Sequence, residues 1–122
     1  MLVVIKDIST LLSSNIKFGG KTMIKHIVMW KLKEFAEGAD KLDNARKAKS
    51  MLEDLRKKIK EIKFIEVGIN INISDNAYDI VLYSEFNNEK ELENYLKYAK
   101  QIRVSDFVKR ISKDKVVVDY EV

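Results

Sequence analysis

His26 is the residue of this chain best suited to acid–base chemistry, because it is the only histidine and imidazole titrates near neutral pH. It could act in a pocket as an acid, a base or a hydrogen-bond donor, or be a buried structural histidine at the edge of a sheet. The chain has no cysteine, which excludes disulfides, thiol nucleophiles and thiolate metal ligands. One histidine also argues against a zinc or haem site within one subunit, so we expect no metal and no cofactor.

The composition is that of one globular domain. Of the 122 residues, 46% are hydrophobic and 34% are charged, and none is proline. The net charge is +4, and residues 41–63 hold nine basic residues against four acidic ones. Because the acids interleave and no aromatics join the run, we interpret it as a solvated helix face and expect no nucleic-acid partner. No stretch is apolar enough for a membrane span or a secretion signal, so we expect a cytoplasmic protein without a membrane partner.

The first residues differ in character from the rest of the chain. Met23 is followed at once by a strand-like run, whereas residues 1–22 match no helix or strand well. Gly19 and Gly20 could be encoded as a ribosome-binding sequence placed shortly before an initiating Met23. We therefore predict an N-terminal extension over residues 1–22, either a translated leader or a genuine extension, and one domain over residues 23–122.

The spacing of apolar residues in that domain predicts the order βαββαβ. Strand-like runs are rich in β-branched residues or alternate with period two, and helical runs bury a stripe at spacings of three and four. Asn88, followed by Glu91, is typical of a helix N-cap with its capping-box partner. We expect strands at residues 24–33, 64–73, 78–86 and 115–122, a polar loop at 34–40, and helices at about 41–60, after Asn88, and at about 105–112.

This order predicts an α+β, ferredoxin-like fold in which helices cover one face of a four-stranded antiparallel sheet. The other face would expose apolar side chains, Ile27 and Met29 or their neighbours, and a sheet-on-sheet homodimer would cover them. On the first strand, Val28 and Trp30 share a face with His26 by parity. The first and last strands of such a sheet are antiparallel neighbours, so Asp119 could reach and orient His26.

The strand sequences resemble those of a known family. The segments 23–33 (MIKHIVMWKLK), 67–70 (VGIN), 78–86 (YDIVLYSEF) and 116–120 (VVVDY) are similar, in the same order, to the strands of the stress-responsive A/B barrel domain, or Dabb. The resemblance covers residues 23–122. It implies a dimeric α+β barrel with a small pocket between sheet and helices, and most members have no established activity. One plant member is a polyketide cyclase that works without metal or bound cofactor.

The resemblance also implies a site. The family pocket takes a histidine from the first strand, which matches His26, and a tyrosine from the second helix, which matches Tyr95; these are the catalytic candidates. The family commonly continues that helix with His-Pro-x-His, whereas residues 98–101 read Tyr-Ala-Lys-Gln. Glutamine does not take up a proton near neutral pH, so the cyclase mechanism is not expected here. Tyrosines on a helix are more often packing residues with hydroxyls at the surface than catalytic acids, and this alternative stays open for Tyr95 and Tyr98. The expected pocket residues are Val28, Trp30, Leu82, Tyr98, Gln101 and Asp119.

Three functions stay open at this point, and whether the protein is an enzyme is among the open questions. The first is a non-enzymatic homodimer that binds a small apolar or aromatic molecule or serves as a scaffold. The second is a cofactor-independent enzyme, of cyclase or lyase type, that uses His26. The third is a haem-degrading or quinone-forming monooxygenase, as in a related superfamily, but no histidine lies on the second helix to ligate iron.

Overall fold

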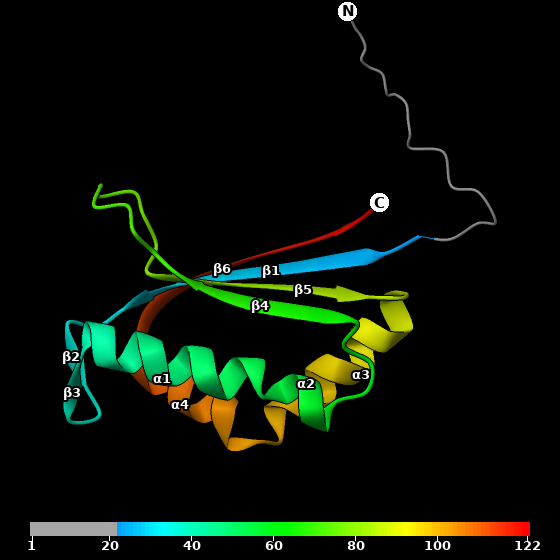
Figure 1. Cartoon of the computed structure of the whole chain (residues 1–122), viewed down its shortest axis with the longest axis horizontal. Coiled ribbons are helices and arrows are strands. Elements are labelled where there is room, and N and C mark those ends of the chain that lie inside the picture. Colours follow the sequence, from blue (N-terminus) through cyan, green and yellow to red (C-terminus); the bar gives the residue numbers. More distant parts are fainter. Residues whose placement is uncertain (1–21) are drawn as a thin grey trace, which may run out of the picture.

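The computed structural model describes residues 22–122 and shows two layers, with one sheet above a layer of helices (Figure 1). The sheet is antiparallel and has the order β4-β5-β1-β6. Its strands are β1 (Ile24–Leu32), β4 (Phe64–Ile69), β5 (Ile80–Phe86) and β6 (Ser112–Glu121). The expected ferredoxin-like fold is therefore confirmed. The predicted extension over residues 1–22 lies outside the described residues, apart from its last one.

The helix layer covers one face of the sheet (Figure 1). It consists of α1 (Lys41–Glu53), α2 (Leu55–Lys58), α3 (Glu89–Lys100) and α4 (Arg103–Ile111). The single helix expected over residues 41–60 is interrupted at Asp54, yet its apolar stripe stays buried on both sides of the break. The Asn88 side chain accepts a hydrogen bond from the Glu91 N–H (2.9 Å), which confirms the predicted N-cap. The reciprocal capping-box bond is not made, because Glu91 Oε1 is buried without a partner among the described residues.

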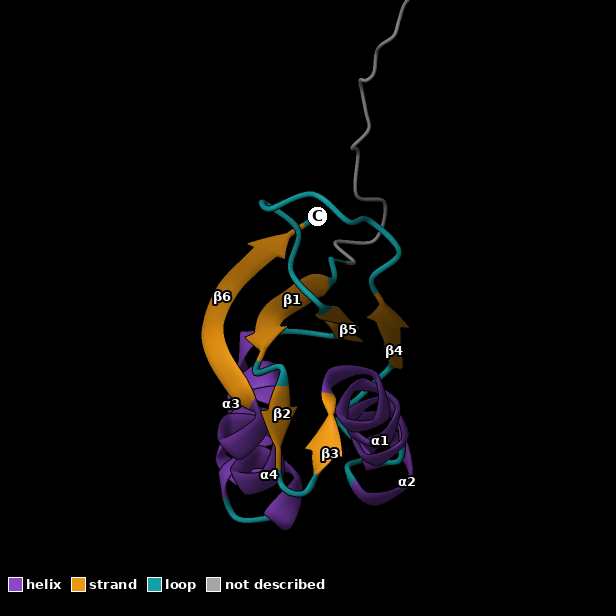
Figure 2. Ribbon diagram, turned by 90° about the vertical axis from the view of Figure 1, so that its left-hand side faces the viewer, coloured by secondary structure: helices purple, strands orange, loops and turns teal. Residues whose placement is uncertain are grey.

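The region expected to be a polar loop, residues 34–40, forms a small hairpin of β2 (Phe35–Ala36) and β3 (Ala39–Asp40) below the sheet (Figure 2). Its turn residues, Glu37 and Gly38, both have positive φ, of 50° and 75°. Two consecutive residues of this kind close a two-residue hairpin, and glycine adopts the conformation without a Cβ clash. The prediction of a polar loop missed these two short strands, because only the glycine marked the turn between them.

The strand expected over residues 64–73 ends early, at Ile69. Ile71 and Ile73 are 97% and 100% exposed, so they do not continue the buried face. The Asn70 side chain makes two hydrogen bonds with the backbone of Asn72. Its amide nitrogen donates to the Asn72 carbonyl, and its oxygen accepts from the Asn72 N–H. Such local side-chain bonds compete with a β ladder and turn the chain, whatever the alternation of apolar residues.

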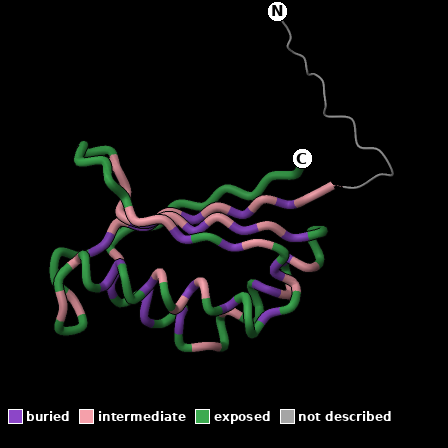
Figure 3. Tube along the Cα trace, viewed as in Figure 1, coloured by how far each residue is buried: buried purple, intermediate pink, exposed green. Residues whose placement is uncertain are grey.

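The core lies between the sheet and the helices, and alternate residues of each central strand point into it. On β1 the buried residues include His26, Val28 and Trp30, as parity predicted. The edge strand β6 differs, because it is exposed along nearly its whole length (Figure 3). Within residues 22–122 no helix is long and apolar enough to cross a bilayer.

Candidate functional site

A cavity of about 640 Å³ lies between β6 and the helices α3 and α4. α1 packs against β4, α3 contacts β1 and β5, and α4 is the helix that contacts β6. Side chains on that side of β6, Val117 and Asp119, line the cavity together with residues of β1. The space therefore lies on the helix-facing side of the sheet, where the edge strand and the helices α3 and α4 meet without filling the volume between them.

His26 and Asp119 meet at the wall of this cavity. They are direct partners in the antiparallel β1–β6 ladder, and His26 Nδ1 lies 2.5 Å from Asp119 Oδ1. His26 is 4% exposed, and its ring makes edge contacts with Tyr95 and Phe86, at centroid distances of 5.9 and 6.4 Å. A carboxylate can only accept, so Nδ1 carries the hydrogen and Nε2 holds the lone pair of the neutral ring. This arrangement orients an imidazole that can act as a base.

Tyr95 supplies the other polar side chain of the inner wall. It comes from the sheet-facing side of α3, is 4% exposed, and packs on Phe86 with the ring centroids 5.0 Å apart. Its hydroxyl makes no hydrogen bond with any residue in the range 22–122, although it borders the cavity. Burial raises the pKa of Tyr95 to about 12, so the phenol stays protonated at neutral pH. The hydroxyl is therefore a hydrogen-bond donor available to a bound molecule.

The rest of the inner wall is apolar. Val28, Trp30 and Leu82 line the cavity from the sheet. The helices contribute apolar residues that were expected to be buried but were not assigned to a pocket. Their helical spacing marked them as core, and only the tertiary structure shows that they border an open space: Leu52, Leu55, Ala99, Val104 and Val108.

Two of the residues implied by the resemblance, Tyr98 and Gln101, do not line this cavity. Tyr98 lies three residues after Tyr95 and is 46% exposed, and Gln101 is the exposed C-cap of α3. On α3 it is Ala99, four residues after Tyr95, that shares the inward face. The expectation for Tyr98 and Gln101 is therefore corrected, because the helix turns both side chains away from the sheet.

The structure holds no cluster of three or more metal-ligating side chains within residues 22–122. The polar groups at the inner wall are an imidazole, its carboxylate partner and a phenol. Together they can donate hydrogen bonds to a ligand oxygen and accept a proton from an acidic carbon or hydroxyl.

The layers and the cavity between sheet and helices define a ferredoxin-like α+β domain. The chain belongs to the stress responsive A/B barrel domain family, whose model matches residues 24–122. This match agrees with the resemblance of the strand sequences. No protein of curated function matches the chain in sequence.

Solved structures show the same fold. A dimeric protein of unknown function with a ferredoxin-like fold, from Bacteroides fragilis, is 33% identical, with 82% of this chain and 96% of that one covered and a TM-score of 0.72. A dimeric ferredoxin-like protein of unknown function from Thermobifida fusca is 16% identical, with 84% and 93% covered and a TM-score of 0.69. A hydroxynitrile lyase from Passiflora edulis is 15% identical, with 82% and 93% covered and a TM-score of 0.60. The T. fusca protein and the P. edulis lyase, at 16% and 15% identity, resemble this chain in fold alone.

Proposed function

We propose that this protein is a homodimer that binds a small apolar or aromatic molecule in the cavity between β6 and the helices. The observation that carries the proposal is the cavity itself. Its volume of about 640 Å³ falls in the range of small-molecule sites, roughly 300–1,000 Å³. An apolar inner wall that carries a few polar side chains, here His26, Asp119 and Tyr95, is the usual composition of such a site, and the Tyr95 hydroxyl has no hydrogen-bond partner among residues 22–122.

A ligand titration tests this proposal. Trp30 is the only tryptophan of the chain and lines the cavity, so its fluorescence reports binding directly. We expect a saturable change with small aromatic ligands, together with a rise in melting temperature. Ala99→Leu fills the cavity with a good helix former and should weaken both effects while the circular dichroism spectrum is retained. Unchanged binding by that variant would contradict the location.

The homodimer is supported by the open face of the sheet. Ile27 and Met29 of β1 are only half-buried, and Val118 of β6 is 55% exposed. Exposed apolar side chains gathered on one face of a sheet are characteristic of an interaction site. The similar proteins from B. fragilis and T. fusca are described as dimeric. A second copy packed on this face would cover the apolar residues of both sheets.

Two charged residues of the open face, Lys25 and Glu85, fit an interface because they are already paired with each other. Lys25 Nζ donates to the Tyr83 hydroxyl at 2.7 Å and to Glu85 Oε2 at 2.9 Å, and the Tyr83 hydroxyl donates to the same carboxylate at 2.6 Å. The hydrogen bonds from Tyr83 and Lys25 lower the pKa of Glu85. Burying a polar group costs less free energy when its hydrogen-bond partner lies in the same subunit, because that bond is kept after a second sheet excludes water.

Light scattering on a sizing column tests the dimer. Val118→Lys places a charge on the open face without removing a core contact, and we expect this variant to elute as a monomer. Leu42→Lys, at a 46% exposed position of α1, is the matched control and should stay dimeric. A monomeric wild type, or a dimeric Val118→Lys variant, would contradict the proposal.

A second candidate function is that of a cofactor-independent enzyme of cyclase or lyase type, favoured by the pairing of His26 with Asp119 beside the Tyr95 hydroxyl. In this candidate, His26 removes an acidic proton, Asp119 stabilises the imidazolium, and Tyr95 donates to the developing oxyanion. Exchange of the α-protons of benzylacetone in heavy water tests it. We expect exchange with the wild type and none with His26→Ala at equal ligand binding. If neither protein accelerates the exchange, the enzyme candidate is contradicted and ligand binding stands as the proposed function.

The cytoplasmic location and the lack of nucleic-acid and membrane partners stay predictions.

A further inference from the structure

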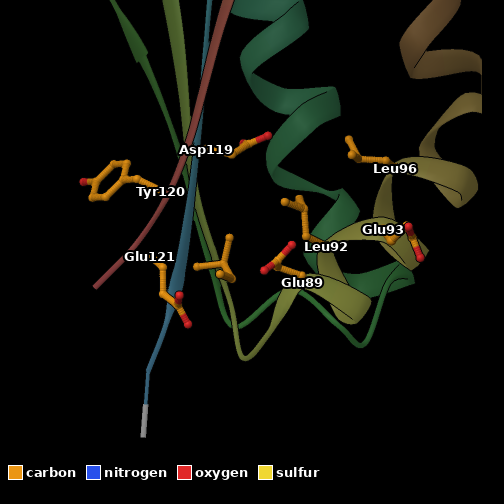
Figure 4. A pocket seen from close by; sticks show the side chains of 8 residues that line it. Glu89, Leu92, Glu93, Leu96, Asp119, Tyr120 and Glu121 are labelled. Carbon is orange, nitrogen blue, oxygen red and sulfur yellow. The ribbon is translucent and has the colours of Figure 1, made fainter. Parts of the chain in front are cut away.

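The two ends of the space beneath β6 carry opposite charge. A second cavity of about 400 Å³ adjoins the main one, since Leu96 and Asp119 line both. Its remaining charged lining residues are all acidic: Glu89 and Glu93 from α3, and Glu121 from the end of β6 (Figure 4). Glu93 has Lys90 as an ion-pair partner at 3.7 Å, and Glu89 and Glu121 have none among residues 22–122. This end is net negative.

The opposite end of the main cavity is net positive. Lys109 from α4, with Lys113 and Lys115 from β6, lines it, and none of the three forms a salt bridge with another described residue. Asp114 is the one acid there, and its carboxylate accepts a hydrogen bond from the Tyr78 hydroxyl at 2.8 Å. The C-terminal end of α4 adds only a partial negative charge. Unpaired ammonium groups at the rim of an apolar cavity favour an anionic headgroup.

The spacing along β6 sets the length of a suitable ligand. Lys115 and Asp119 point to the same side of the strand, opposite Trp30 and His26 respectively. Four residues of strand correspond to about 13 Å. The apolar wall formed by Val28, Trp30 and Val108 lies between the two ends. A phenyl ring on a short alkyl chain has a comparable length.

We infer that the cavity selects an amphipathic monoanion, an aryl or alkyl carboxylate whose headgroup lies at Lys109 and Lys115 and whose apolar body extends toward His26 and Tyr95. This inference rests on the proposed binding function. Burial of the apolar body supplies most of the affinity, because binding free energy follows apolar area removed from water. The charges set the orientation, since the acidic end repels the headgroup and the lysines attract it.

Three ligands with one apolar body and different headgroups test the inference: phenylbutyrate, phenylbutanol and phenylbutylamine. Binding is measured by Trp30 fluorescence and calorimetry. Two partly exposed ion pairs correspond to about a tenfold preference for the acid over the alcohol, and we expect the amine to bind weakest. The preference should fall as salt is added, because exposed charges are screened.

The double variant Lys109→Gln with Lys115→Gln should lower the affinity for phenylbutyrate to that for phenylbutanol, and leave the alcohol unchanged. The matched control, Lys97→Gln with Lys100→Gln, removes the same charge from exposed positions of α3 that line neither cavity, and should keep the preference. Equal binding of acid and alcohol by the wild type, or a preference that survives in the double variant, overturns the inference and leaves the proposed function intact. Failure of all three ligands to bind overturns both.

Discussion

His26 Nδ1 lies 2.5 Å from Asp119 Oδ1, although the two residues are 93 positions apart in the chain. The contact exists because β1 and β6 are antiparallel neighbours and their register sets these residues directly opposite each other. Both side chains point to the helix-facing side, where the cavity lies. One backbone ladder thus fixes the position of the imidazole, its tautomer and its access to a bound molecule.

The first prediction concerns that tautomer. In wild type, nitrogen NMR should show the neutral His26 ring protonated at Nδ1, because Asp119 accepts the Nδ1 hydrogen. Asp119→Ala removes the acceptor, so the spectrum should shift toward the Nε2–H form. Asp114→Ala, five residues earlier on the same strand, removes a carboxylate whose partner is the Tyr78 hydroxyl and should leave the tautomer unchanged. A wild-type ring that is protonated mainly at Nε2 would contradict the pairing.

The second prediction concerns stability at alkaline pH. Burial raises the pKa of Tyr95 from 10.0 to about 12, so the folded state keeps a proton that the unfolded state loses between these values. Stability is therefore fully present below pH 10 and falls as the pH rises to about 12, by roughly 2–3 kcal/mol. In the Tyr95→Phe variant, the free energy of unfolding measured with denaturant should decline less between pH 10 and about 12. The ultraviolet titration of the folded variant should also lack the tyrosine ionisation that occurs at the highest pH in wild type. Tyr120→Phe, at an exposed position, should leave that ionisation in place.

The third prediction concerns how α1 caps the edge strand β4. Glu53 Oε2 accepts from the Val67 N–H at 3.0 Å and from Lys49 Nζ at 2.8 Å, and Lys49 donates in turn to the Val67 carbonyl. Burial raises the pKa of Glu53, but the hydrogen bonds from Lys49 and Val67 outweigh it, and the net pKa lies below 4.5. Stability from this group is thus present above pH 4.5 and lost as the pH falls through the folded pKa.

Urea denaturation of Glu53→Gln tests this capping. The variant should lose about 1 kcal/mol at neutral pH and show a weaker decline of stability in acid. Glu66→Gln, on the exposed side of β4, removes a carboxylate that makes no hydrogen bond within the described part of the chain, and should change little. Equal effects of the two substitutions would mean that Glu53 does not cap the strand.

The fourth prediction concerns the start of α3, the helix that carries Tyr95. Asn88→Ala removes the side-chain acceptor of the Glu91 N–H and should lower the free energy of unfolding by about 1 kcal/mol. The neighbouring Asn87→Ala is the control, because Asn87 is exposed and caps no helix. Hydrogen exchange should show that the loss is concentrated in the first turn of α3. Equal destabilisation by both substitutions would contradict the assignment of the cap.

Local patterns in the sequence were enough for the layers and for half of the site. Parity on one strand placed His26, Val28 and Trp30 on the core side, and antiparallel geometry brought Asp119 to His26, because side-chain alternation and ladder direction are local rules. The same rules failed at Ile71 and Ile73, where hydrogen bonds of asparagine side chains ended the strand while the alternation continued.

Other parts of the site were decided only by the tertiary structure. Periodicity marks Leu52 and Val108 as buried, but it does not distinguish a packed core from the wall of a cavity. That difference depends on how the helices meet the sheet, since α3 contacts β1 and β5 while α4 contacts β6, and a cavity remains between them. The opposite charges at the two ends also arise in three dimensions, since Lys109 and Lys115 come together from a helix and a strand that no sequence pattern relates.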